Sequence, residues 1–248
     1  MGEHEEIEIT GAGSGLDAAL ASFTSDGEAA KLSAEVFASM QAHGYAHIEQ
    51  PLTAQAFDAV AQQLGTITLR TDLTLTPDRS SIVYKSAEIN FHQDNPTMNI
   101  LGWYCVRQDA LDGSMRLLDA GDVADHFSRR ERQIMSSINV RCPDPGRHNP
   151  DRGLFAYFLW PLLTEKRTRI EVYYAPWLLL DAYDEEQQSA LAKFAAYLRA
   201  KEANQLINIR LKAGESLFID NNRLLHGRGA IQPASQRFLK RVWIKRQR

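Results

Sequence analysis

Short runs of β-type residues, each bounded by turn residues, occupy most of the chain from Ser81 onward. Runs of roughly four to eight residues rich in β-branched and aromatic side chains are typical of strands, and many in succession favour an antiparallel sandwich or barrel. The polar stretch 164–168 lies between two such runs, which predicts a hairpin with a long loop. We predict strands at 45–49, 82–85, 89–92, 100–106, 115–119, 138–141, 154–163, 169–174, 206–211, 216–219, 224–226 and 238–244.

Three segments have helical character instead. Apolar residues near helical spacing predict a helix over about 29–43. Thr53 as the N-cap and Gly65 as the stop bound a second helix over about 53–64. A third, over about 184–202, opens with acids and carries bases near its end, which complements the helix dipole. Early helices, many short strands and one inserted helix predict an α+β chain around an antiparallel core with a concave interior.

The composition fits one globular domain, which we expect over residues 1–248, with residues 1–15 as a flexible arm. No stretch approaches the roughly 20 apolar residues that cross a membrane, and the acidic start matches neither a secretory signal nor a transit peptide. We therefore expect a cytoplasmic protein. The formal net charge of −3 gives no field that would attract nucleic acid. Two cysteines cannot form a disulfide framework or a thiolate metal cage.

A candidate metal site begins at His92 and Asp94, which fall on and just after a predicted strand. Residues i and i+2 of a strand point to the same face, so one imidazole and one carboxylate should project together. His226 lies far downstream, again beside strand and turn residues. Two histidines and one carboxylate on one face of a metal leave open coordination positions, which suits non-haem iron(II). A structural zinc site would instead be closed by four protein ligands.

Arg237 and Arg241 follow on the last predicted strand, separated by an even number of residues, so they should share a face. Two guanidinium groups on one face of a partly apolar strand are costly unless an anion pairs with them. The fork of a guanidinium is suited to hold a carboxylate through two parallel hydrogen bonds. Beside the predicted metal ligands, this pattern favours an anionic ligand over two exposed charges on an edge strand.

With these residues in order, the chain resembles the iron(II)/2-oxoglutarate-dependent dioxygenases of the taurine dioxygenase and clavaminate synthase-like group, from about Gly44 to Ile244. The segment 214–228 is similar to the stretch around that family's distal iron-binding histidine. The resemblance implies a double-stranded β-helix (jelly-roll) core with flanking helices. It also implies iron(II), 2-oxoglutarate and dioxygen, with Arg237 on the distal carboxylate of 2-oxoglutarate. The implied iron ligands are His92, Asp94 and His226.

The second contact to 2-oxoglutarate departs from the family's pattern. Many members have a threonine or serine shortly after a Gly-Gly-type turn, and here Met115 or Arg116 lands on that position, with Ser114 just before it. Ser114 and Arg116 are therefore both candidates. Related halogenases replace the metal carboxylate by a small residue, so the presence of Asp94 favours hydroxylation or a related oxidation.

The expected activity is hydroxylation of an unactivated C–H bond in a small molecule that bears a carboxylate, such as a free amino acid. Candidate substrate contacts are Arg241, Arg228, Asn90 and Asn95, and the tryptophans Trp103, Trp160 and Trp177 are interpreted as core. Alternatives are a family oxidase that desaturates or cyclises its substrate, a jelly-roll module that binds a metal or keto acid without turnover, and a zinc hydrolase. Homo-oligomer formation is left open.

Overall fold

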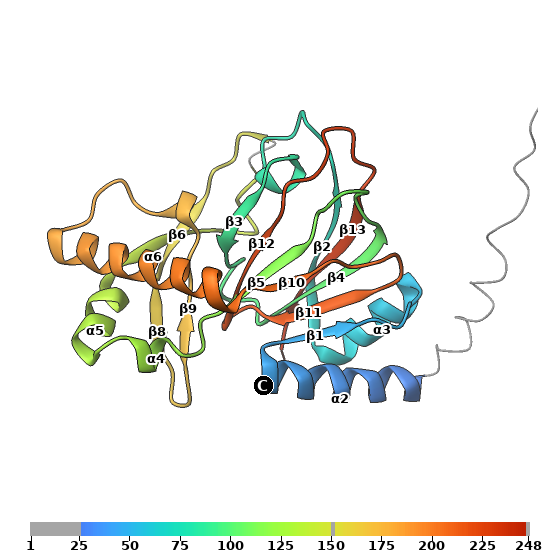
Figure 1. Cartoon of the computed structure of the whole chain (residues 1–248), viewed down its shortest axis with the longest axis horizontal. Coiled ribbons are helices and arrows are strands. Elements are labelled where there is room, and N and C mark those ends of the chain that lie inside the picture. Colours follow the sequence, from blue (N-terminus) through green and yellow to red (C-terminus); the bar gives the residue numbers. More distant parts are fainter. Residues whose placement is uncertain (1–25, 150–151, 247–248) are drawn as a thin grey trace, which may run out of the picture.

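The computed structural model describes residues 26–149 and 152–246, and the arm predicted over residues 1–15 lies outside them. Two antiparallel sheets form its centre (Figure 1). One has the strand order β1-β11-β4-β13-β2 and the other β10-β5-β12-β3. The strands are β1 (Tyr45–Ile48), β2 (Thr66–Thr74), β3 (Ile89–His92), β4 (Ile100–Arg107), β5 (Met115–Asp119), β10 (Ile207–Ile209), β11 (Ser216–Asp220), β12 (Leu224–Arg228) and β13 (Phe238–Lys245).

The chain changes sheet at nearly every step. Strands β2, β4, β11 and β13 lie in the larger sheet, and β3, β5, β10 and β12 alternate with them in the smaller one. A five-stranded and a four-stranded sheet joined in this way make the double-stranded β-helix, so the predicted jelly-roll core with flanking helices is confirmed. The strand pairs β12–β3 and β13–β4 bring the middle of the sequence against its end.

An apolar cluster between the two sheets holds them together. Leu101 and Leu239 come from the larger sheet, Leu117 and Leu224 from the smaller, and all four are fully buried. Burial of a leucine side chain stabilises a fold by roughly 1.5–3 kcal/mol. This cluster lies beside the histidines and arginines of the predicted site, since Trp103 and Met115 belong to it and also line the site's cavity.

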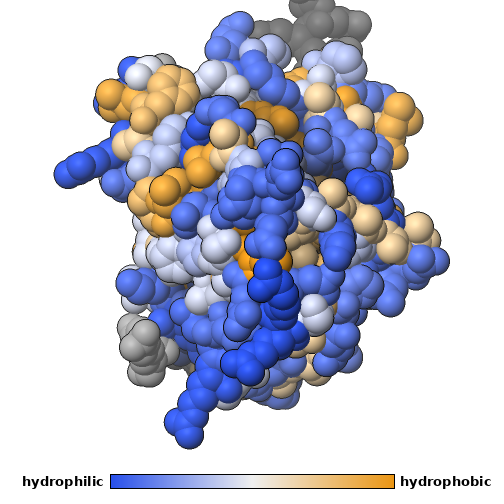
Figure 2. Space-filling model, turned by 90° about the vertical axis from the view of Figure 1, so that its left-hand side faces the viewer, coloured by the Kyte–Doolittle hydropathy of each residue, from blue (hydrophilic) through white to orange (hydrophobic). Residues whose placement is uncertain are grey.

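Helices cover the outer faces of the sheets. α2 (Asp26–His43) and α3 (Ala54–Leu64) pack on the larger sheet through a cluster that includes Phe218 and Ile244, and the Ala56 amide donates to the predicted N-cap Thr53. α6 (Glu185–Gln205) packs with α5 (Arg129–Ser137) near the smaller sheet. The face that carries α5 and α6 is mostly hydrophilic, with separate apolar patches (Figure 2). All three predicted helices are therefore confirmed, with α6 extending to Gln205.

Three local predictions were wrong or incomplete. Residues 82–85 were predicted as a strand, but Ile82–Tyr84 forms the 3-10 helix η2. Strand β2 was missed although Ile67, Leu69 and Leu73 alternate with polar residues, and most of its residues are exposed at the sheet edge. The helices α4 (Val123–His126) and α5 were also missed, since α4 spans barely a turn and α5 has the sequence RRERQIMSS, with too few apolar residues for a periodic signal.

The predicted hairpin of 154–163 and 169–174 is only partly correct. Strand β7 (Tyr157–Pro161) pairs with β6 (Asn139–Pro143), whereas β8 (Leu163–Glu165) pairs with β9 (Ile170–Val172) as a short hairpin. The 3-10 helix η4 (Pro176–Leu178) then leads toward α6. Within residues 26–149 and 152–246, no helix has the length and apolar content to cross a membrane.

Candidate active site

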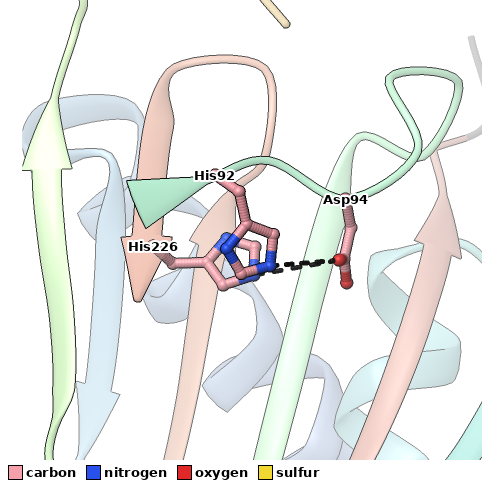
Figure 3. Close-up of side chains that lie close together, drawn as sticks. All are labelled: His92, Asp94 and His226. Atoms are coloured by element: carbon pink, nitrogen blue, oxygen red, sulfur yellow. Dashed lines mark ion pairs between the residues drawn. The ribbon is translucent and has the colours of Figure 1, made fainter. Parts of the chain in front are cut away.

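The three predicted metal ligands converge at one point between β3 and β12 (Figure 3). His92 and His226 face each other directly in the β3–β12 pairing, and their ring centroids lie 4.3 Å apart. Asp94 follows just past the end of β3. Its Oδ1 atom lies 3.7 Å from His92 Nε2 and 3.9 Å from His226 Nε2. One ligand atom from each residue lies within 4.8 Å of the others, so a single ion can contact all three.

The two histidines are arranged to bind as neutral imidazoles. Burial lowers the pKa of His92, and burial together with the neighbouring His92 lowers the pKa of His226 well below its ordinary value. His92 Nδ1 lies 2.8 Å from the Asn90 carbonyl oxygen, a hydrogen bond in which the nitrogen donates. This leaves Nε2 of His92 with a free lone pair toward Asp94. A backbone carbonyl that fixes the tautomer of a ligating histidine is a common second contact in metal sites.

The two oxygens of the Asp94 carboxylate have different neighbours. Its Oδ2 atom accepts hydrogen bonds from Arg241 Nη1 at 2.8 Å and from the Trp243 indole nitrogen at 2.9 Å. Burial alone would raise the pKa of Asp94, but Arg241 and the other polar neighbours outweigh it and lower this pKa. The carboxylate therefore stays ionised, with Oδ1 free to face the histidines. Two neutral imidazoles and one carboxylate fit iron(II) with open coordination positions.

A cavity extends from the metal ligands to Arg237. About 370 Å³ of space there is not filled by protein atoms, and part of it is open to solvent. Arg237 is buried, its Nε donates to Gln108 Oε1 at 3.0 Å, and its Nη2 donates to the Gly113 carbonyl at 3.3 Å. Burial lowers the pKa of Arg237 to about 10, so it remains charged near neutral pH. The lining residues are Leu73, Val83, Ile89, His92, Trp103, Met115, His226, Gly227, Arg228, Arg237 and Arg241.

A family model described as "Taurine catabolism dioxygenase TauD, TfdA family" matches residues 10–243, which include every predicted site residue. The chain belongs to this family. Gamma-butyrobetaine dioxygenase from Homo sapiens and from Pongo abelii each match with 22% identity over 172 residues, 64% of this chain and 44% of theirs. The chain thus spans less than half the length of these curated relatives.

Solved structures of oxygenases share the fold of this TauD-family chain. Asparagine oxygenase in complex with Fe(II), 2S,3S-3-hydroxyasparagine and succinate is 18% identical with a TM-score of 0.68, covering 87% of this chain and 79% of that one. The non-heme iron oxygenase OrfP in complex with Fe and alpha-ketoglutaric acid is 16% identical with a TM-score of 0.65, covering 91% and 81%. The resemblance and the jelly-roll core predicted from the sequence are confirmed.

Two predicted co-substrate contacts lie elsewhere in this TauD-family chain. Arg116 is on the outer side of β5, where it pairs with Glu88 and Glu202 and covers the ring of Phe91. Ser114 is buried, but its hydroxyl donates to Asp112 Oδ1 at 2.7 Å. Neither residue lines the cavity.

The predicted substrate contacts are also spread over different environments. Asn90 has an exposed side chain, and its backbone carbonyl accepts the hydrogen bond from His92 Nδ1. Asn95 is buried and donates to the Pro143 carbonyl at 3.1 Å, so it holds two loops together. Arg241 lines the cavity and is paired with Asp94, while Arg228 lines the cavity near Arg237.

Trp177 was interpreted as core, and this was wrong. It is 43% exposed on η4, and its ring centroid lies 4.8 Å from that of His92. Trp103 and Trp160 do pack against core clusters, and Trp103 also lies 5.2 Å from His226, ring to ring. Trp177 and Trp243 are thus aromatic neighbours of the metal ligands that the sequence pattern did not single out.

Asn221 holds the loop that carries Asp94, a role missed in the sequence. Its Oδ1 accepts from the Asp94 amide at 3.2 Å, and its Nδ2 donates to the carbonyls of Asn95 and Met98. It is almost fully buried at the turn between β11 and β12. Its position inside the conspicuous segment 214–228 is the only signal that could have drawn attention to it.

Substitution of Asn221 by alanine is expected to lower iron(II) affinity about 10- to 100-fold, because outer contacts orient ligating carboxylates. Anaerobic iron(II) titration of the wild-type protein and the variant measures the change. Asn204→Ala is the control, since that side chain is exposed on α6 and, among the described residues, hydrogen-bonds to the Ala200 carbonyl alone. Equal affinities in Asn221→Ala and wild type would show that the loop holds its position without this residue.

The buried histidines predict that the metal-free protein loses stability at mildly acidic pH. In the folded chain the pKa values of His92 and His226 lie below the ordinary histidine value of about 6.5. As pH falls below about 6.5, the unfolded chain therefore takes up protons that the folded chain does not, and the free energy of unfolding decreases. Urea unfolding with a chelator present, between about pH 7.5 and 5, tests this. The prediction would be contradicted if the free energy of unfolding depended on pH equally in the wild type and in a His92→Gln/His226→Gln variant.

Proposed function

We propose that this TauD-family chain is an iron(II)- and 2-oxoglutarate-dependent oxygenase that hydroxylates a C–H bond of a small carboxylate-bearing substrate. The observation that carries the proposal is the shared cavity: His92 and His226 of the metal cluster line it, and so does the buried guanidinium of Arg237. The cluster fits iron(II) with open positions, and the guanidinium fits a carboxylate. 2-Oxoglutarate combines a chelating keto acid with a distal carboxylate and so matches both.

The protein's own contribution is orientation and charge. His92, Asp94 and His226 would hold iron(II), which supplies the oxidation chemistry when bound. Arg241 and Trp243 keep one oxygen of Asp94 engaged, so the other remains available to the metal. Arg237 would bind the distal carboxylate of 2-oxoglutarate and so fix the keto acid with respect to the metal. The apolar lining, with Leu73, Val83 and Ile89, limits water in the cavity.

A free amino acid is the substrate class we propose. The fold neighbours bear on this choice: asparagine oxygenase was solved with 3-hydroxyasparagine and succinate, and OrfP with hydroxylated forms of L-Arg. Arg241 is the cavity residue placed to meet a substrate carboxylate beside the metal, and its Nε is buried without a hydrogen-bond partner. We also propose that Asn90 and Asn95 support substrate binding by positioning the loop around the metal. We further propose that the protein is cytoplasmic and can form a homo-oligomer.

A mass-spectrometric screen tests the activity and the substrate class together. Amino acids and small acids are incubated with the protein, iron(II), 2-oxoglutarate, ascorbate and air. We expect one added oxygen in one substrate, with succinate formed in step with oxygen consumption. Loss of two hydrogens would instead identify a desaturase or cyclase. If the wild type formed no more succinate than a His226→Ala variant with any compound of the panel, a binding module would be favoured. If zinc rather than iron(II) restored activity to the metal-free protein, a hydrolase would be favoured.

A further inference from the structure

Arg228 is a second buried guanidinium in the same cavity. It lies on β12, two residues after His226, and is 4% exposed. Its Nη2 donates to the carbonyls of Lys85 at 2.8 Å and Ala87 at 2.5 Å, which fixes the plane of the group. Its Nε and Nη1 are buried without a hydrogen-bond partner. Buried donors are normally satisfied, so two orphan donors on a charged group that lines a cavity indicate a missing acceptor.

No carboxylate of the described residues forms an ion pair with Arg228 or Arg237. The nearest acids by charge are Asp109 and Asp112, and both are occupied by other donors. Asp109 accepts from the amides of Leu111, Asp112 and Gln232. Asp112 accepts from the amide and hydroxyl of Ser114. The two arginines therefore bring positive charge to the cavity that no direct ion pair among the described residues neutralises.

Arg228 lies near Arg237 in the cavity. Arg228 lies opposite Met115 in the β12–β5 pairing, and the Met115 sulfur lies 3.8 Å from Arg237 Nη2, so both arginines flank the same residue. After burial, the charge of Arg228 also lowers the pKa of Arg237. Arg241, by contrast, pairs with the metal ligand Asp94. The cavity thus has one arginine that pairs with a metal ligand and two that form no ion pair with the described residues. Two like charges buried together are costly unless an anion lies between them, and a carboxylate can accept from both.

We propose that Arg228 binds the distal carboxylate of 2-oxoglutarate together with Arg237, in place of the substrate contact expected from the sequence. The inference rests on the proposed function and adds to it: the co-substrate is held by two guanidinium groups. Ser114 and Arg116, the earlier candidates for this second contact, face away from the cavity. The thioether of Met115 lies against Arg237 Nη2 at 3.8 Å, so the side chain at that place offers no hydroxyl.

Two keto acids separate this contact from a structural role. 2-Oxoglutarate carries the distal carboxylate, whereas 2-oxopentanoate has the same chelating end with a methyl group in its place. Each is titrated anaerobically into the iron(II) protein, and the visible absorption of the chelate gives Kd. In Arg228→Gln we expect Kd for 2-oxoglutarate to rise about 10- to 100-fold. Kd for 2-oxopentanoate should stay within about threefold, because that ligand makes no charged contact there.

Two further variants sharpen the comparison. Arg228→Lys keeps the charge but not the fork, so we expect a smaller loss for 2-oxoglutarate alone, and it serves if Arg228→Gln does not fold. Arg223→Gln is the control, since Arg223 pairs with Asp119 outside the cavity. Equal weakening of both keto acids, or unchanged binding of 2-oxoglutarate, would overturn the assignment. Absence of the chelate absorption with either acid in the wild type would instead overturn the proposed function.

Discussion

Replacement of Arg237 by alanine is expected to weaken 2-oxoglutarate binding by at least about 100-fold, because a buried charge-assisted pair is lost together with its geometry. Arg237 is 5% exposed and is held by Gln108 and the Gly113 carbonyl on one side of the cavity. Alanine removes the charge and leaves Gln108 Oε1 with one donor fewer. The measurement is the anaerobic titration of the iron(II) protein with 2-oxoglutarate, followed by the visible absorption of the chelate.

Lys240→Ala is the matched control for Arg237→Ala. Lys240 lies on β13, three residues after Arg237, but pairs with the exposed Asp72, and it does not line the cavity. It should leave the affinity for 2-oxoglutarate unchanged within about twofold, as surface ion pairs contribute little. If Arg237→Ala bound 2-oxoglutarate as tightly as Lys240→Ala does, Arg237 would have no role in holding the co-substrate.

Replacement of His226 by alanine should remove most of the iron(II) affinity, by more than the roughly 10- to 100-fold that loss of an outer contact costs. His226 supplies one of three ligand atoms, and neither remaining ligand can take its place across the β3–β12 pairing. Because the variant loses its iron(II), its turnover should also fall below detection. Anaerobic equilibrium dialysis with iron(II) measures the first effect, and succinate release measures the second.

The control for His226→Ala is His43→Ala, an exposed histidine at the end of α2. It should bind iron(II) like the wild type, and circular dichroism of both variants shows whether the fold is kept. Iron(II) binding by a folded His226→Ala variant at wild-type affinity would exclude His226 as a ligand. His92→Ala would then have to be compared with His43→Ala in the same way.

The metal ligands could be predicted because strand geometry is regular. The spacing of two pointed to His92 and Asp94, although Asp94 lies just past the end of β3 in a loop held by Asn221. His226 was identified by the resemblance around residues 214–228. The same alternation, applied to β5, explains why Arg116 lies elsewhere: Met115 and Leu117 face the core, so Arg116 between them must face outward. That conclusion was available from the sequence, once the strand was placed.

Other features of the site depend on tertiary contacts that no local pattern encodes. Trp243 reaches Asp94 across 149 residues, and Asn221 reaches the same loop across 127. These hydrogen bonds follow from the register of β13 against β4 and from the turn between β11 and β12. Trp177 was misplaced for a similar reason: η4 lies after a hairpin whose pairing was only partly predicted, so its position beside His92 could not be anticipated.

The central claim is that His92, Asp94, His226 and Arg237 together hold iron(II) and 2-oxoglutarate in one cavity. The most direct measurement is the absorption spectrum of the metal-free protein after anaerobic addition of iron(II) and then 2-oxoglutarate. We expect a visible charge-transfer band that appears only when both are present and that is greatly weakened in Arg237→Ala. A folded wild-type protein that shows no such band at saturating iron(II) and 2-oxoglutarate would contradict the claim.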